Sequence, residues 1–123
     1  MTDARRALGA AGEAAARTYL EGCGYRVLDH NTRHGGVEID IVAERRGVVA
    51  FVEVKTRRGA SHGGAAEAVD ARKRLRLVRG AAAWLSETRR RPRVVRFDVI
   101  ACEPGPDDAF RVTHWEGAFD AGD

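Results

Sequence analysis

Two apolar runs in the first half of the chain have the pattern of a β-hairpin. Residues 37–43 and 48–55 are rich in β-branched side chains, and polar positions recur every second residue. The polar stretch between them, residues 44–47, includes a glycine and is typical of a turn. The pattern therefore predicts two neighbouring antiparallel strands.

The charged side chains of this hairpin are predicted to share one face, because successive residues of a strand point to opposite sides. A loop of two or four residues pairs positions whose numbers add to 91, which sets Glu38 opposite Glu53. Asp40 then lies opposite Phe51 and diagonal to Glu53, at about 7–8 Å between backbone positions. Lys55 falls on the same face, whereas a three-residue loop would break the arrangement. Like charges across a sheet are destabilising, and a divalent cation is the simplest compensation.

Two other stretches have helical spacing. Residues 3–23 carry small and apolar side chains three and four apart, and Gly24 is suited to end that helix. Asp70 is the predicted N-cap of a second helix, which reaches about Thr88 and is stopped by residues 89–92. Its predicted inward stripe is Ala71, Leu75, Val78, Ala82 and Leu85, widened by Leu77, Ala81 and Trp84.

The remaining segments complete an α/β pattern. Residues 25–28 predict a short strand and residues 31–36 a loop, while residues 94–101 and 109–115 predict two further strands. The order of helix, strands, helix and strands predicts an α/β sandwich with a mixed central β-sheet flanked by helices.

Composition agrees with one globular domain. The 123 residues are 44% hydrophobic and 32% charged, with an expected core from about residue 4 to 115 and an acidic tail at 116–123. Cys23 and Cys102 are too few for a disulfide framework or a zinc site. The absence of a long apolar run or an apolar leader at the start favours a cytoplasmic protein without a membrane partner.

The charge is unevenly distributed, although the formal net charge is only +3. Basic residues concentrate between the hairpin and the strand at 94–101, and acidic residues concentrate near the C-terminus. Such polarity can offer one face to a polyanion, and a solvated helix face explains it equally well. The cations predicted to contact nucleic acid are Arg33, Arg57, Arg58, Arg72, Lys73 and Arg76.

The spacing of the hairpin acids carries a resemblance. Asp40 precedes the tripeptide Glu53-Val54-Lys55 by 13 residues, which resembles the PD-(D/E)XK nuclease signature. A longer set of residues resembles the YraN-like family of small bacterial proteins and spans about residues 5 to 115. That set is Gly12-Glu13, Gly24-Tyr25, Asn31, Arg33, Glu38-Ile39-Asp40, Phe51 to Arg57, Lys73 and Arg96 to Ile100. The acidic and basic positions are also similar to those of archaeal Holliday junction resolvases.

The resemblance implies a restriction-endonuclease-like fold and a metal site. Asp40, Glu53 and the Val54 carbonyl would hold Mg²⁺ or Mn²⁺, and Lys55 would orient a water or stabilise an oxyanion. Glu13 would be a further ligand, although by position alone it forms a surface ion pair with Arg17, four residues on. Two more acids would have supporting roles. These are Glu38 and Asp98, and the alternative for Asp98 is an ion pair with Arg96 on the same strand face.

Three functions follow as alternatives. The first is a Mg-dependent endonuclease that hydrolyses phosphodiester bonds in DNA, including branched or damaged DNA. The second is a nucleic-acid-binding protein with a nuclease fold and little catalysis. The third is a non-catalytic interaction module whose carboxylates pair with arginines. Many nucleases of this fold act as homodimers, which makes a homodimer an option here.

Overall fold

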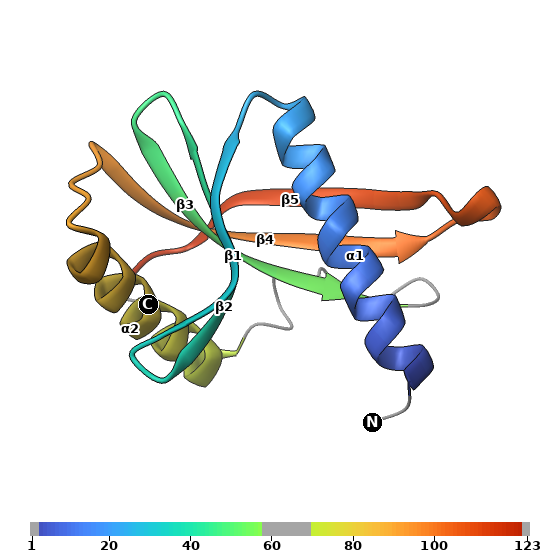
Figure 1. Ribbon diagram of the computed structural model, residues 1–123, viewed down its shortest axis with the longest axis horizontal. Coiled ribbons are helices and arrows are strands. Elements are labelled where there is room, and N and C mark those ends of the chain that lie inside the picture. Colours follow the sequence, from blue (N-terminus) through green and yellow to red (C-terminus); the bar gives the residue numbers. More distant parts are fainter. Residues whose placement is uncertain (1–2, 58–69, 122–123) are drawn as a thin grey trace.

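The computed structural model describes residues 3–57 and 70–121. Within them, two helices and five strands form an α/β sandwich, which confirms the predicted fold class (Figure 1). The helices are α1 (Asp3–Gly22) and α2 (Ala71–Thr88). The strands are β1 (Arg26–His34), β2 (Val37–Arg45), β3 (Val48–Thr56), β4 (Val94–Pro104) and β5 (Phe110–Phe119), with a short 3-10 turn, η2 (Pro106–Asp108), before β5. The sheet order is β1-β2-β3-β4-β5, and it is mixed because only β3 and β4 pair in parallel.

The two helices cover opposite faces of the sheet. On the α1 face, Ala16 and Leu20 pack with Val52 and other buried residues. On the α2 face, Trp84 packs with Phe51, whose ring meets it edge to face at 5.6 Å between centroids. Phe51 and Val52 are neighbours on β3, so the strand divides its side chains between two cores. Neither helix in the described ranges is long and apolar enough to cross a membrane.

The predicted helices are confirmed, and the inward face of α2 is corrected. Asp70 caps α2 by accepting a hydrogen bond from the Lys73 backbone N–H at 3.0 Å. Leu75 was placed inward by its hydrophobicity, but its side chain is 61% exposed. The buried residues are Leu77, Ala81 and Trp84, which the prediction gave as the widening of the stripe, together with Gly80. Gly80 explains the choice of face, because a Cβ there would lie 3.1 Å from Val37, so the helix approaches β2 through its smallest residue.

The hairpin register differs by two residues from the prediction. Arg45 pairs with Val48, and paired positions add to 93, so Val42 rather than Asp40 lies opposite Phe51. The turn is Arg46-Gly47, with φ of 53° and 79°. Positive φ at both central residues is the geometry of a type I′ turn, which suits the twist of a two-residue hairpin. A two-residue loop at Arg45 and Arg46, one of the two loop lengths predicted, would have placed two side-chain-bearing residues in that conformation.

Two strands extend beyond their predicted ends. β1 continues through residues 31–34, which were predicted to be a loop, because it pairs with β2 as far as His34 and Val37. β5 runs past the predicted end at residue 115 to Phe119, whose ring stacks on Phe97 at 5.3 Å. Part of the expected acidic tail is therefore a strand. Arg58, one of the predicted nucleic-acid contacts, lies outside the described residues.

Candidate functional site at the open end of the hairpin

Asp40 lies where β2 and β3 separate. Their backbone pairing runs from Arg45 and Val48 to Ile41 and Val52. Beyond it, the Val54 backbone N–H donates to Asp40 Oδ2 at 2.8 Å. The carboxylate thus occupies the place of a backbone acceptor at the end of the ladder.

The alternation of β2 breaks next to Asp40. Ile39 packs in the core beneath α2, whereas Ile41 packs in the core beneath α1. Strict alternation would put these two residues on the same face. The break directs Asp40 towards α1, where Glu13 projects from the helix.

A hollow of about 460 Å³ opens between α1 and the separated strand ends, and we call it the acidic hollow. It is lined by Arg5, Arg6, Leu8, Gly9, Ala10, Glu13, Asn31, Glu38, Asp40, Val54 and Thr56. α1 comes close to the sheet here because Gly12 is buried against Thr56, and a Cβ at Gly12 would lie only 2.0 Å from Thr56 Oγ1. The sequence therefore places the backbone next to Glu13 directly on β3.

The acidic surroundings of Asp40 alter its titration. Burial and then the charge of Glu53 raise its pKa to about 7, with further contributions from Glu13 and Glu38. The hydrogen bond from Val54 opposes the shift only in part. The ionised carboxylate is poorly compensated by the protein alone.

Glu13 is also incompletely compensated. Burial raises the pKa of its carboxyl group, while Arg17 and His30 act in the opposite direction. Arg17 Nη1 lies 3.5 Å and His30 Nδ1 3.7 Å from Glu13 Oε1, and the predicted pair with Arg17 is therefore present. These are ion-pair distances, and the buried Oε1 atom accepts no hydrogen bond.

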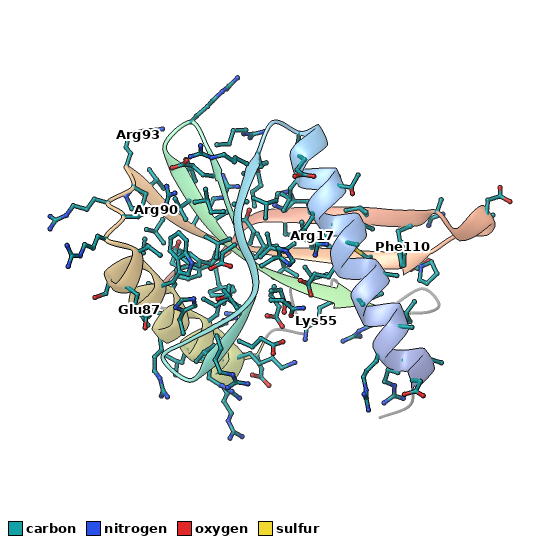
Figure 2. All side chains as sticks on the ribbon, viewed as in Figure 1. Arg17, Lys55, Glu87, Arg90, Arg93 and Phe110 are labelled. Carbon is teal, nitrogen blue, oxygen red and sulfur yellow. The ribbon has the colours of Figure 1, made fainter. Side chains whose placement is uncertain are left out.

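Glu53 and Lys55 lie on the other face of β3. Val52 and Val54 pack in the α1-side core, so the residues that alternate with them face α2. Lys55 Nζ is 3.5 Å from Glu53 Oε1, and Figure 2 shows Lys55 at the end of β3 between the two helices. The prediction that Asp40 shares a face with both residues is wrong, because it assumed regular alternation through β2.

A second hollow of about 170 Å³ lies on this α2 side, and we call it the lysine hollow. It is lined by Val37, Glu38, Glu53, Lys73, Arg76 and Leu77. Glu38 lines both hollows, so they meet at the end of the sheet. Glu53 is close enough across that end to act on the charge of Asp40.

The oxygen donors suit a hard cation such as Mg²⁺. In the described part of the chain, no group of three or more His, Cys, Asp or Glu side chains is placed to hold a metal ion. Mg²⁺, however, is commonly bound by one or two carboxylates, with waters and substrate phosphates completing its octahedron. Asp40 and Glu13 face one hollow, and Glu13 contributes a buried oxygen without a hydrogen bond. This pair fits such a cation.

The predicted nucleic-acid contacts among the described residues lie near the same end of the molecule, but they do not form one continuous row. Arg33 is exposed and donates to the Gly36 carbonyl at 3.1 Å. Arg57 lines a shallow hollow with Arg5 beside Thr56. The remaining described cations, Arg72, Lys73 and Arg76, are exposed in the first turns of α2.

Arg5 and Arg6, which the sequence pattern did not single out, line the acidic hollow. Helical spacing was an available signal, because Arg6 precedes Glu13 by seven residues, or about two turns of one helix face. These cations bring positive charge to the rim of an otherwise acidic site.

Asp98 belongs to a different cluster. It is fully buried, and Arg96 donates to its two carboxylate oxygens from Nε and Nη2, each at 2.8 Å. His114 Nε2 lies 2.8 Å from Oδ2, and the Gly117 N–H donates to Oδ1 at 3.0 Å. Burial would raise the pKa of Asp98, but the hydrogen bonds from His114, Arg96 and Gly117 lower it overall. The predicted ion pair with Arg96 is confirmed, and Asp98 does not line the acidic hollow.

These features define a small α/β sandwich protein with carboxylates gathered at the open end of a hairpin. The chain belongs to the family described as Uncharacterised protein family UPF0102, whose model matches residues 12–102. The match confirms the YraN-like resemblance. The matched range includes every residue from Glu13 to Lys73 discussed above.

Similar proteins cover nearly the whole chain. A UPF0102 protein of Symbiobacterium thermophilum is 46% identical over 116 residues, which are 94% of this chain and 98% of the relative. A UPF0102 protein of Syntrophotalea carbinolica is 47% identical over 120 residues, covering 98% of this chain and 97% of the relative. A third, of Moorella thermoacetica, is 48% identical over 101 residues, covering 82% and 84%.

Proposed function

We propose that the protein is a metal-dependent endonuclease that hydrolyses phosphodiester bonds in DNA. The observation that carries the proposal is the state of Asp40. Its half-buried carboxylate is repelled by Glu53, Glu13 and Glu38, with a pKa of about 7, and it faces a hollow open to a substrate. Perturbed carboxylates in an open hollow are typical of functional sites.

The acidic hollow would hold Mg²⁺ or Mn²⁺. Asp40 and Glu13 would bind it from one side, with the Val54 carbonyl beside them and Glu53 reaching across the end of the sheet. Such a cation, when bound, lowers the pKa of a coordinated water and neutralises charge on the phosphoryl group. It would also relieve the repulsion at Asp40.

The protein's own cations would then handle the phosphate. Lys55, held 3.5 Å from Glu53, would orient the attacking water or stabilise the developing oxyanion. Glu38, at the junction of the hollows, would support both sides. Arg33, Arg57, Arg58 and Arg72 would position the nucleic acid through its phosphates without reading sequence.

A cleavage assay tests the proposal directly. Single-stranded, duplex, flapped and four-way DNA are incubated with Mg²⁺ or Mn²⁺ and resolved on gels. Wild type is expected to cut at least one substrate, whereas Lys55→Ala and Asp40→Asn lose about 10²-fold or more of the rate. Equal low activity of all three proteins would contradict the proposal.

A melting titration tests the metal separately. Binding to the folded state alone raises stability by about 2.7 kcal/mol at a 100-fold excess over Kd. Wild type is expected to melt at a higher temperature as Mg²⁺ or Mn²⁺ is added, and Asp40→Asn is not. No shift in wild type would remove the metal from the proposal.

The second candidate is a nucleic-acid-binding protein with little catalysis. The observation that favours it is the separation of Asp40 from Glu53 and Lys55 on opposite faces, with Lys55 paired to Glu53. In this case the logarithm of the DNA-binding affinity falls linearly with the logarithm of the salt concentration, and no metal supports cleavage.

A further inference from the structure

The two lysines of this chain come together in the fold. The sequence has 19 arginines and only Lys55 and Lys73, which are 18 residues apart. Lys55 is the last residue but one of β3, and Lys73 lies in the first turn of α2. The Lys55 ammonium group lies near Lys73 and lowers its pKa, and Glu53 and Asp70 oppose that shift only in part. Because arginine provides nearly all the basic residues of this chain, the proximity of its two lysines is a specific feature of the fold.

The start of α2 has an unusual charge pattern. A helix N-terminus is positive and is normally stabilised by acids in the first turn. The first turn of α2 has no acid and instead carries Arg72, Lys73 and Arg74, with Asp70 only at the cap. A local rule broken in this way, at the mouth of a hollow, is expected at functional positions.

The charges around the lysine hollow favour an anion. Lys55, Lys73 and Arg76 bring three positive charges, whereas Glu38 and Glu53 bring two negative ones. Glu53 is already engaged by Lys55 at 3.5 Å. Lys73 and Arg76, one helical turn apart, border the same 170 Å³ space from α2. A phosphate between the two ammonium groups would remove their mutual repulsion.

We infer that Lys55, Lys73 and Arg76 form a metal-independent phosphate subsite on the α2 side, which adjoins the acidic hollow at Glu38. Compact ammonium groups can converge on one phosphate oxygen, which broad guanidinium groups do less readily. The identification of the phosphate as part of a nucleic acid rests on the proposed function. The phosphate is either an internal diester or a terminal phosphate of the strand, and the two sources can be distinguished.

Inorganic phosphate tests the subsite without nucleic acid. Wild type, Lys73→Ala and Arg91→Ala are melted in EDTA with sodium phosphate or sodium chloride at equal ionic strength. Arg91 is an exposed cation beyond the other end of α2 and is the matched control. Phosphate is expected to raise the melting temperature of wild type and of Arg91→Ala by about 3–6 °C more than it raises that of Lys73→Ala. Equal shifts in all three proteins would overturn the inference. Lys73→Gln is measured in parallel and should match Lys73→Ala.

Oligonucleotide binding identifies the source of the phosphate. Fluorescence anisotropy in EDTA is recorded across a salt series, with DNA strands that carry or lack a 5′ phosphate. Removing one phosphate contact lowers the slope of log affinity against log salt by about one. A lower slope for Lys73→Ala on both strands indicates an internal phosphate, and a lower slope only on the phosphorylated strand indicates a terminal one.

The two measurements separate failure of the subsite from failure of the proposed function. If the phosphate shift depends on Lys73 but the protein neither binds nor cuts DNA, the subsite stands and the nuclease proposal fails. If the protein cuts DNA but Lys73→Ala changes neither the phosphate shift nor the salt slope, the nuclease proposal stands and the subsite fails.

Discussion

Asp40 and Asp98 are two aspartates on central strands of one sheet, and their surroundings are opposite. Asp98 is completely buried and receives hydrogen bonds from Arg96 and Gly117, with His114 in contact. Asp40 is half-buried, and among residues 3–57 and 70–121 its hydrogen-bond donor is the N–H of Val54. The pKa of Asp98 is lowered, whereas that of Asp40 is raised to about 7.

The difference separates a carboxylate that stabilises the fold from one that the proposed function assigns to the site. Where donors saturate an acid, its charge stabilises the fold and no ligand is needed. Where other acids surround it beside a hollow, the folded protein holds repulsion that a bound cation can relieve. Sequence alone made both aspartates candidates for the site.

The largest expected effect is on stability when the two aspartates are replaced by asparagine. Asp98→Asn removes the charge of a fully buried carboxylate that pairs with the partly buried Arg96, which keeps Glu116 at 3.2 Å as an acidic partner, and this is expected to cost about 3 kcal/mol. Asp40→Asn keeps an oxygen for the Val54 N–H and removes a repelled charge, so stability at pH 8 is unchanged or higher. Urea unfolding at pH 8 measures both, and similar losses would contradict the distinction.

The pH dependence of stability should have opposite signs for the two residues. The pKa of Asp40 is raised from 3.8 to about 7, so its contribution is complete below pH 4 and is lost as pH rises through 7. The lost amount is on the order of a few kcal/mol. Asp98 has a lowered pKa, so its contribution is present above pH 4 and is lost as pH falls through its folded pKa.

The difference between wild type and Asp40→Asn isolates the Asp40 contribution. Unfolding free energies are measured from pH 4 to 8 in EDTA, to keep divalent cations out. The difference should change steadily across this range, and a flat difference would show that Asp40 titrates normally.

A smaller effect is expected when one neighbouring charge is removed. Glu13→Gln takes away one of the carboxylates that repel Asp40, so the pKa of Asp40 should fall towards its ordinary value. Carbon-13 NMR titration of the Asp40 carboxyl group measures this. Glu21→Gln, on an exposed turn of the same helix, is the matched control and should leave the Asp40 titration in place.

The smallest effect is expected at an exposed ion pair. Arg26 Nη2 lies 2.8 Å from Glu44 Oε1, and the arginine side chain is 70% exposed. Arg26→Ala is expected to cost about 0–1 kcal/mol, less at high salt, because water screens such pairs. Urea midpoints at low and high salt check this, and a loss as large as that of Asp98→Asn would undermine the ranking by burial.

The elements with strong local signals were predicted from the sequence. The helix starting after Asp70 and the one ending before Gly24 have both periodicity and caps, so local chemistry determines them. The alternating strand after residue 94 was equally clear. The extension of β1 through residue 34 was not, because it depends on pairing with β2 rather than on its own polar sequence.

The site was predicted in composition but not in geometry. The spacing of Asp40 and Glu53 identified the acids that act on each other, and Glu13 joined them through family resemblance. The break in alternation between Ile39 and Ile41 has no signature in the sequence, because both residues are buried isoleucines. The face to which each isoleucine points depends on the core against which it packs.

The hydrogen bond from Val54 to Asp40 makes this amide a natural reporter. A cation that draws Asp40 Oδ2 towards itself competes with the N–H of Val54 for the same oxygen. Hydrogen exchange at that single amide should then speed up as the cation binds, even where the rest of β3 becomes better protected. One proton at the open end of the hairpin would thus record occupancy of the hollow before any bond in a substrate is broken.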